Sequence, residues 1–110
     1  MTIDVIRTLI DYNYARHEQL WTSIDYLSDE QFIAETDYSL KSIRNHMVHV
    51  MDADTRWLAR IQEAPVQQHL AFEDFSTREA TRAHWDTVVH KVKTYVESAT
   101  DEDLNRPLTF

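Results

Sequence analysis

Two histidines three residues apart, His46 and His49, stand in the stretch SIRNHMVHV, which otherwise has the spacing of an apolar helix face. Side chains three apart are neighbours on a helix, so both imidazoles could reach one metal ion. A catalytic zinc-like site takes three protein ligands and leaves one position open, so a third donor has to come from elsewhere. The other interpretation is that the pair packs at a helix border and only hydrogen-bonds there, which is the commoner role of histidines so spaced.

The remaining histidines offer weaker patterns. His17 falls on the predicted apolar stripe of the first helix beside Asn13, so these groups form either a buried network or the wall of a polar pocket. His90 stands four residues from Asp86, which indicates an exposed pair on one helix. His69 lies in a predicted loop, without a neighbour that suggests a metal ligand. Spacing alone therefore does not supply the third donor.

The composition excludes several kinds of chemistry. There is no cysteine, which removes disulfides, thiolate nucleophiles and cysteine-ligated zinc. There is no glycine either, so neither a G-x-S-x-G nucleophile turn nor a glycine loop for phosphate can be built. The sequence also contains no H-E-x-x-H or H-x-x-x-H. Any metal site in this chain must therefore use histidine, carboxylate and water.

The net charge of the chain indicates which kinds of partner it can bind. Nineteen acidic residues against eleven basic ones give a net charge of −8, which repels phosphate backbones and anionic lipid. We therefore expect no nucleic-acid partner. The apolar runs are far shorter than the ~20 residues of a membrane span, and the first ten residues lack the pattern of a signal peptide. We expect no membrane association and a location in the cytoplasm.

The elements that carry these residues are predicted by apolar periodicity to be three long helices. The first covers residues 3–27, the second runs from about residue 40 to 63 before Pro65, and the third has about 22 residues. Lys41, Asn45, Asp52, Arg56 and Glu63 are predicted to form the solvated face of the second helix. The predicted apolar stripes are Ile3, Ile6, Ile10, Asn13, His17, Leu20, Ile24 and Leu27; Ile43, Met47, Val50, Trp57 and Ile61; and Trp85, Val88, Val92, Tyr95 and Ala99.

Capping signals mark the helix ends. Ser28 with Gln31 predicts a capping box that opens a short helical turn, and the stretch STRE predicts another that begins with Ser76. The stretch AETDYS reads as a loop in which Ser39 or Ser42 caps the second helix. The stretch TDED predicts a last short turn. On a wheel of the second helix, His46 lies near the apolar face and His49 at its border, which favours His46 as the more buried one.

Three stretches in this order and spacing resemble the DinB-like superfamily of four-helix proteins. They are YNYARHEQLWTSIDYLSDEQF, SIRNHMVHVMDADTRWLARI and DFSTREATRAHWDTVVHKVKTYVESATDEDLNRPLTF, which together cover nearly the whole chain. The resemblance implies an all-α, up-down helical bundle of the DinB-like four-helix type, with three long helices in one domain over residues 1–110. Its most specific part is the second helix, through Ser42, Ile43, His49, Val50, Asp54, Trp57 and Leu58.

The resemblance also implies a metal site. In that superfamily the histidine of this helix is one of three that hold a divalent ion, and it corresponds to His49 rather than to His46. We therefore expect His49 as a ligand of nickel, zinc or iron, with His17 and His46 next to the site without binding the ion. The resemblance assigns no catalytic residue in this chain.

The resemblance further implies a missing part. Superfamily members continue past the equivalent of DEDLNRPLTF into a helix with an H-x-x-x-H pair, whereas this chain stops at Phe110. We therefore expect a domain shortened at its C-terminus, with an incomplete three-histidine site. Helices that would pack against a further helix leave an apolar groove, and such a groove favours a homo-oligomer, most simply a dimer.

Two functions follow from these expectations. The resemblance implies a metal-dependent hydrolase, or a transferase that works with a small-molecule thiol, in which the ion polarises a substrate group or activates water or thiol. The other function is a helical interaction or dimerisation module without catalysis, which binds a partner helix or a second copy in the open groove. Metal content and oligomeric state separate the two.

Overall fold

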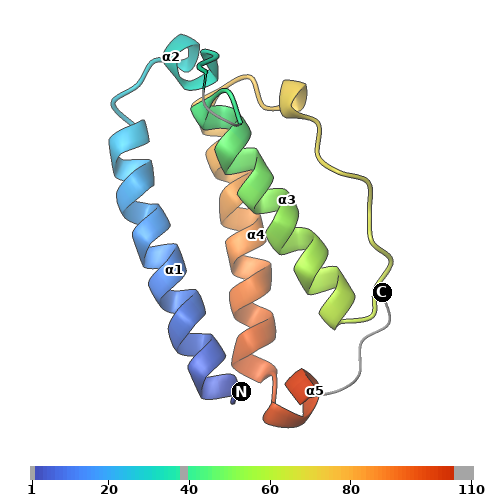
Figure 1. Ribbon diagram of the computed structural model, residues 1–110. Helices are drawn as coiled ribbons and strands as arrows, with labels where there is room; N and C mark the ends of the chain where they lie inside the picture. The colour runs from blue at the N-terminus through green and yellow to red at the C-terminus, as the bar shows by residue number, and fades with distance from the viewer. Residues whose placement is uncertain (1, 38–39, 106–110) are drawn as a thin grey trace.

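The computed structural model describes residues 2–37 and 40–105, and these residues form helices and loops without a strand (Figure 1). The prediction of an all-α bundle with three long helices is confirmed. None of the helices in these ranges is long and apolar enough to cross a bilayer. The elements are α1 (Ile3–Ile24), α2 (Asp29–Ile33), α3 (Ile43–Ile61), the 3-10 turn η1 (Phe72–Asp74), α4 (Arg78–Ser98) and α5 (Asp101–Asn105).

The long helices do not simply alternate in direction. Helix α1 runs opposite to α3, but α4 runs in the same direction as α3, because the segment of residues 62–77 returns along the bundle before α4 begins (Figure 1). Helix α4 packs against both α1 and α3 and lies between them. The helices α1 and α3 are therefore joined mainly through α4 rather than through each other.

Large aromatic side chains form the centre of the core. Trp21 of α1 and Trp85 of α4 are 1% and 2% exposed, and their ring centroids lie 5.8 Å apart in an edge-on arrangement. Phe32 of α2 is fully buried beside Trp21, at 6.2 Å between centroids. Each such side chain contributes roughly 1.5–3 kcal/mol by leaving water, so this cluster holds α1 and α2 against α4. Met47 and Met51 extend the core to α3.

The buried stripe of α1 differs from the predicted one. Tyr14 and Trp21 are buried, whereas Asn13 is exposed and Leu20 is 39% exposed. The prediction placed positions 13 and 20 inside, one residue away from the positions that α4 covers. The physical reason is that a tyrosine and a tryptophan bury more apolar area than a leucine, so the helix turns them toward the core.

The prediction of the solvated face of α3 is wrong at two positions. Asn45 and Asp52 are buried, while Ile43 and Trp57 of the predicted stripe are 39% and 37% exposed. The segment after α3 folds back along it and places Leu70, Phe72 and Phe75 against the core. Helix α3 is therefore covered on two sides, and a single stripe cannot describe it.

Most of the predicted caps are found. Ser28 and Gln31 form the capping box of α2, and Ser42 caps α3, which begins at Ile43 rather than at residue 40. Ser39 lies outside the described residues. Helix α4 begins one residue later than predicted, because the hydroxyl of Thr77, not Ser76, accepts a hydrogen bond from the Ala80 amide at 3.1 Å. The stretch TDED does open the short helix α5.

The C-terminus of α3 closes without glycine. The Ala64 amide donates to the Ala59 carbonyl at 2.8 Å and the Glu63 amide to the Arg60 carbonyl at 3.1 Å, which is the bonding of a Schellman motif. Glu63 therefore takes the left-handed conformation, with φ of 57°, that glycine usually occupies. A side chain in this region crowds its own backbone, at a cost of about 1 kcal/mol.

We expect Glu63→Gly to raise the free energy of unfolding by about 0.5–1 kcal/mol, because glycine adopts this backbone without the crowding. Urea denaturation followed by circular dichroism measures the change. The neighbouring Gln62→Gly is the matched control, since Gln62 has an ordinary φ of −84° and its replacement should lower stability by a similar amount. Two shifts of the same sign would contradict this explanation.

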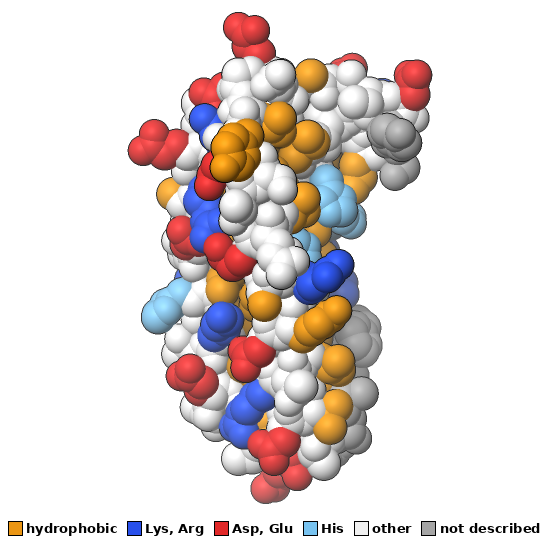
Figure 2. All heavy atoms as spheres, turned by 90° about the vertical axis from the view of Figure 1, so that its left-hand side faces the viewer, with side chains coloured by type: hydrophobic (Ala, Val, Ile, Leu, Met, Phe, Trp, Pro, Cys, Tyr) orange, Lys and Arg blue, Asp and Glu red, His pale blue; other side chains and the backbone are white. Residues whose placement is uncertain are grey.

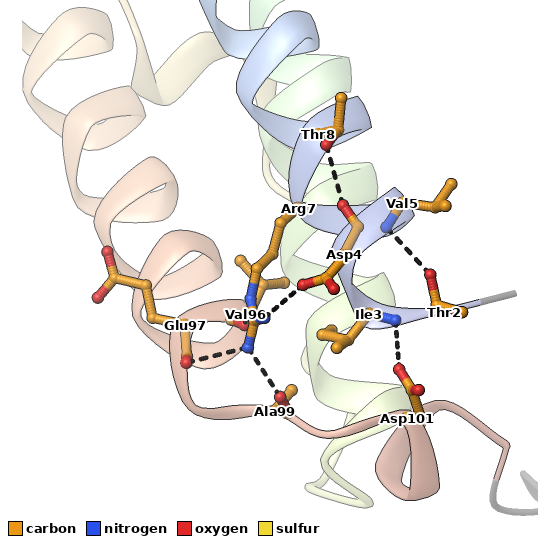
Figure 3. A network of polar contacts seen from close by, with 10 residues as sticks. All are labelled: Thr2, Ile3, Asp4, Val5, Arg7, Thr8, Val96, Glu97, Ala99 and Asp101. Carbon is orange, nitrogen blue, oxygen red and sulfur yellow. Dashed lines mark hydrogen bonds and ion pairs between the residues drawn. The ribbon is translucent and has the colours of Figure 1, made fainter.

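Arg7 ties the start of α1 to the end of α4 (Figure 3). Its guanidinium donates to the carbonyl oxygens of Val96 at 2.8 Å, Glu97 at 3.2 Å and Ala99 at 3.0 Å. The last turn of α4 has no basic residue of its own, so the cation from α1 satisfies carbonyls that the helix leaves open. Asp4 adds an ion pair to Arg7 at 3.1 Å.

We expect Arg7→Met to lower the free energy of unfolding by about 1–3 kcal/mol, because methionine keeps the aliphatic packing and removes the charged hydrogen bonds. The same substitution at Arg16, an exposed position of α1, should change stability by less than about 0.5 kcal/mol. Thermal and urea unfolding of both variants make the comparison. Equal losses in the two variants would mean that the Arg7 contacts contribute nothing.

Candidate functional site

A groove lies between α1 and α3, and of the three predicted site histidines it is His46 that lines it. Its upper part is a pocket of about 500 Å³ that includes Leu20, Ile43 and His46. Its lower part is a pocket of about 230 Å³ that includes Tyr14 and Asp54. Viewed from the side of α1, histidine side chains stand next to hydrophobic ones at the edge of the molecule (Figure 2). We call this feature the α1–α3 groove. His49 lines another pocket of α3, beside Arg56 and His69.

His17 is half-buried on α1 and packs against Trp85 of α4. Its Nδ1 lies 2.9 Å from the Asn13 carbonyl oxygen, and its ring is tilted against Trp85 at 5.1 Å between centroids. A carbonyl oxygen only accepts, so Nδ1 carries the proton and Nε2 is the nitrogen that remains for another partner. The pairing of His17 with the polar Asn13 thus uses the backbone of Asn13 rather than its side chain.

His46 and His49 are both exposed on α3, and the expectation that His46 is the more buried of the two stays a prediction. Partial desolvation lowers the pKa of His46, and the nearby charges of His17 and His49 lower it further. His17 and His49 therefore each lie close enough to His46 to act on its charge. His90 is exposed on α4, and Asp86 pairs with Arg82 at 2.9 Å instead of with His90.

Asp54 and Tyr14 form a hydrogen bond across the groove, in which the Tyr14 hydroxyl donates to Oδ2 of Asp54 at 2.8 Å. Burial raises the pKa of Asp54, and this effect outweighs the Tyr14 hydrogen bond and the charge of His17, which both favour the ionised form. Burial and the neighbouring carboxylate also raise the pKa of Tyr14. A half-buried carboxyl group beside the histidines is therefore kept easy to protonate.

A second polar cluster lies on the other side of α3. His69 Nδ1 lies 2.5 Å from Oδ2 of Asp52, and the Leu70 amide donates to Oδ1 at 3.0 Å. Periodicity predicted a solvent-exposed Asp52, and the spacing of His69 indicated no neighbour that could share a metal ion with it. Nothing in the spacing indicates this pair, because 17 residues and a loop separate the partners and only the fold brings them together.

The donors present do not fit a resident metal ion by themselves. Within residues 2–37 and 40–105, no group of three His, Cys, Asp or Glu side chains is placed to hold one. His49 offers one imidazole, and His17 and His46 lie near it without completing a set of ligands. A site with one protein ligand leaves too many positions to water, so an ion would need donors from outside these residues.

The comparisons with known proteins agree with the fold. The sequence profile described as the DinB family matches residues 1–110. The matched range contains both helices that border the groove, as well as α4 beneath it. No curated protein matches the chain. The resemblance drawn from the sequence is thereby confirmed, and the roles of His49, His17 and His46 stay predictions.

We expect Asp54→Asn to raise the free energy of unfolding at pH 7 by about 1 kcal/mol or less, because asparagine still accepts from Tyr14 and carries no buried charge. The folded pKa of Asp54 is raised, so the native carboxylate costs stability as the pH rises through that pKa. The gain should therefore shrink toward pH 3–4. Urea unfolding at several pH values measures it, with exposed Asp11→Asn as the control. A gain that is constant with pH would contradict the assignment.

Proposed function

The chain belongs to the DinB family, and from this premise we propose that it presents His49 as one ligand of a divalent metal ion and obtains the remaining donors from a second copy. The observation that supports the proposal is that His17 of α1 and His49 of α3 both lie close enough to His46 for their charges to lower its pKa. Nickel, zinc and iron are the ions suited to imidazole donors. The described residues of one copy do not complete the site.

A second copy suits the open face of the bundle. His46 and His49 are exposed and three residues apart, so each copy offers a pair of imidazoles and two copies offer four. Leu20 and Ile43 beside them are 39% exposed and would be buried on association. Each chain carries a net charge of −8, which opposes self-association, and a cation between the copies offsets part of that repulsion.

The activity that follows is metal-dependent hydrolysis, or transfer that uses a small-molecule thiol. When bound, the ion would polarise a substrate oxygen or lower the pKa of a water or thiol. Within this chain, Asn13 fixes the proton of His17 on Nδ1, which leaves Nε2 to accept a proton. Asp54, with its raised pKa, could exchange a proton on the same side of the bundle.

A metal-independent dimerisation module is the second candidate. The observation in its favour is the set of partly exposed apolar side chains along the groove, whose exposure ranges from 37% to 52%. Such a row marks an interface in many soluble proteins. It is formed by Leu9, Leu20, Ile43 and Trp57.

We expect Zn²⁺ to bind the purified chain at about one ion per two chains and to convert it to a dimer. His49→Ala should weaken zinc binding by about tenfold or more, because it removes a ligand from each copy. His90→Ala, an exposed histidine on α4, is the matched control and should leave binding unchanged. Isothermal titration calorimetry gives the stoichiometry, and sedimentation velocity with zinc or with EDTA gives the oligomeric state.

Three outcomes would contradict this proposal. A dimer that persists in EDTA and in His49→Ala favours the metal-independent module. A tightly bound ion in a monomer would mean that one chain completes the site by itself. Loss of zinc binding in His90→Ala to the same degree as in His49→Ala would show that the ion binds exposed histidines without a defined site.

A further inference from the structure

A second pocket lies outside the α1–α3 groove, between α3 and the segment of residues 62–70. It encloses about 420 Å³, and its lining includes Arg56, Trp57, Arg60 and His69. Trp57 is 37% exposed, so part of its indole remains open to a ligand. We call this feature the α3–loop pocket. Trp57 borders both this pocket and the α1–α3 groove, and His49, the predicted metal ligand, also lines the pocket.

The charge of this pocket is opposite to that of the protein. The chain as a whole carries −8, but the lining of the α3–loop pocket has two arginines against the single carboxylate of Asp52. The two oxygens of that carboxylate already contact His69 and the Leu70 amide. Arg56 is anchored, since its Nη1 donates to the Gln67 carbonyl at 2.7 Å. A fixed guanidinium in an otherwise acidic protein favours an anion at this place.

The Asp52 and His69 pair holds an imidazole at the rim of the pocket. Burial raises the pKa of Asp52, but hydrogen bonds from His69 and Leu70 and the charges of His69 and Arg56 outweigh it, so this pKa is lowered. An ionised carboxylate only accepts, so Nδ1 of His69 carries the proton that faces it. The side chain of His69 is 72% exposed, which leaves Nε2 accessible. The carboxylate thus fixes the imidazole in one tautomer and one orientation.

We propose that the α3–loop pocket binds a small organic oxyanion, a phosphate monoester or carboxylate carried on a flat apolar body. Arg56 and Arg60 would bind the oxyanion, the ring of Trp57 would stack on the body, and His69 would hydrogen-bond to the ligand through Nε2. Guanidinium groups match the geometry of phosphate and carboxylate, and tryptophan offers the largest flat surface for stacking. This binding needs no metal ion, so it can be tested apart from the function proposed above, although His49 lines the same pocket.

The test is a titration of the ¹⁵N-labelled full chain in EDTA with phenyl phosphate, inorganic phosphate and phenol, followed by NMR. We expect shifts at the Trp57 indole and at the side chains of Arg56, Arg60 and His69. Phenyl phosphate should bind about tenfold more tightly than phosphate, and phenol should cause no such shifts. The nitrogen shifts of His69 should also show the proton on Nδ1 in the neutral ring.

Variants then separate the contributions. Arg56→Gln and Arg60→Gln should each weaken the binding of phenyl phosphate about tenfold. Arg16→Gln, at an exposed position of α1, should leave this binding unchanged. Trp57→Leu should lower the affinity for phenyl phosphate to that for inorganic phosphate. Circular dichroism checks each fold, and if Arg56→Gln unfolds through loss of its contact with Gln67, Arg60→Gln and Trp57→Leu decide the test. Zinc binding in Arg60→Gln should equal that of the unaltered chain.

Three results would overturn the proposal. One is chemical-shift changes at all cationic side chains, together with an Arg16→Gln variant that binds phenyl phosphate as weakly as Arg60→Gln does. Another is phenol binding as well as phenyl phosphate, which would mean that the oxyanion is not recognised. The third is the absence of shifts at Trp57 and Arg56 at millimolar phenyl phosphate. None of these results bears on zinc binding by His49, so this proposal can fail while the metal proposal stands.

Discussion

The packing of α1 on α4 through their tryptophans determines where a groove can form in the bundle. Trp21 and Trp85 meet edge to face, and Tyr14 meets the same Trp85 ring at 6.3 Å. This contact fixes α1 on one side of α4, while α3 packs on α4 through its own buried face. Because both helices use α4 as their support, the space between them does not have to be filled by their own side chains. The α1–α3 groove is a consequence of that arrangement.

Helix α3 shows how two carboxylates only two residues apart can acquire opposite properties. Asp52 receives a hydrogen bond from an imidazole and another from a backbone amide, and its pKa is lowered. Asp54 faces α1, receives one hydrogen bond from a neutral hydroxyl, and its pKa is raised. The number and charge of the donors decide the outcome, since both groups lose water on folding. One helix thereby carries a carboxyl group that ionises more readily than usual and another that takes up a proton more readily than usual.

The sequence predicted the helices well because periodicity and capping are local properties. The capping box at Ser28 and the cap at Ser42 depend on neighbours within three residues, and both were found. The buried side of α1 was missed at Tyr14 and Trp21, because the choice between adjacent positions depends on what α4 presents. The Asp52 contact was missed for a similar reason, since it requires the segment after α3 to return along the helix. His49 was identified through the family resemblance. That His17 and His49 both act on His46 could not be predicted, because it depends on how α1 and α3 are placed around α4.

The clasp between Arg7 and the end of α4 joins residues 89 to 92 positions apart in the chain. During translation, the first helix therefore leaves the ribosome long before the helix that covers it has been made. Its tyrosine and tryptophan stay in contact with water or with a chaperone until some eighty further residues have followed. Such a topology makes the speed of elongation and the supply of chaperones part of what sets the yield of folded protein. The synthesis of α4 is the step that ends this exposure.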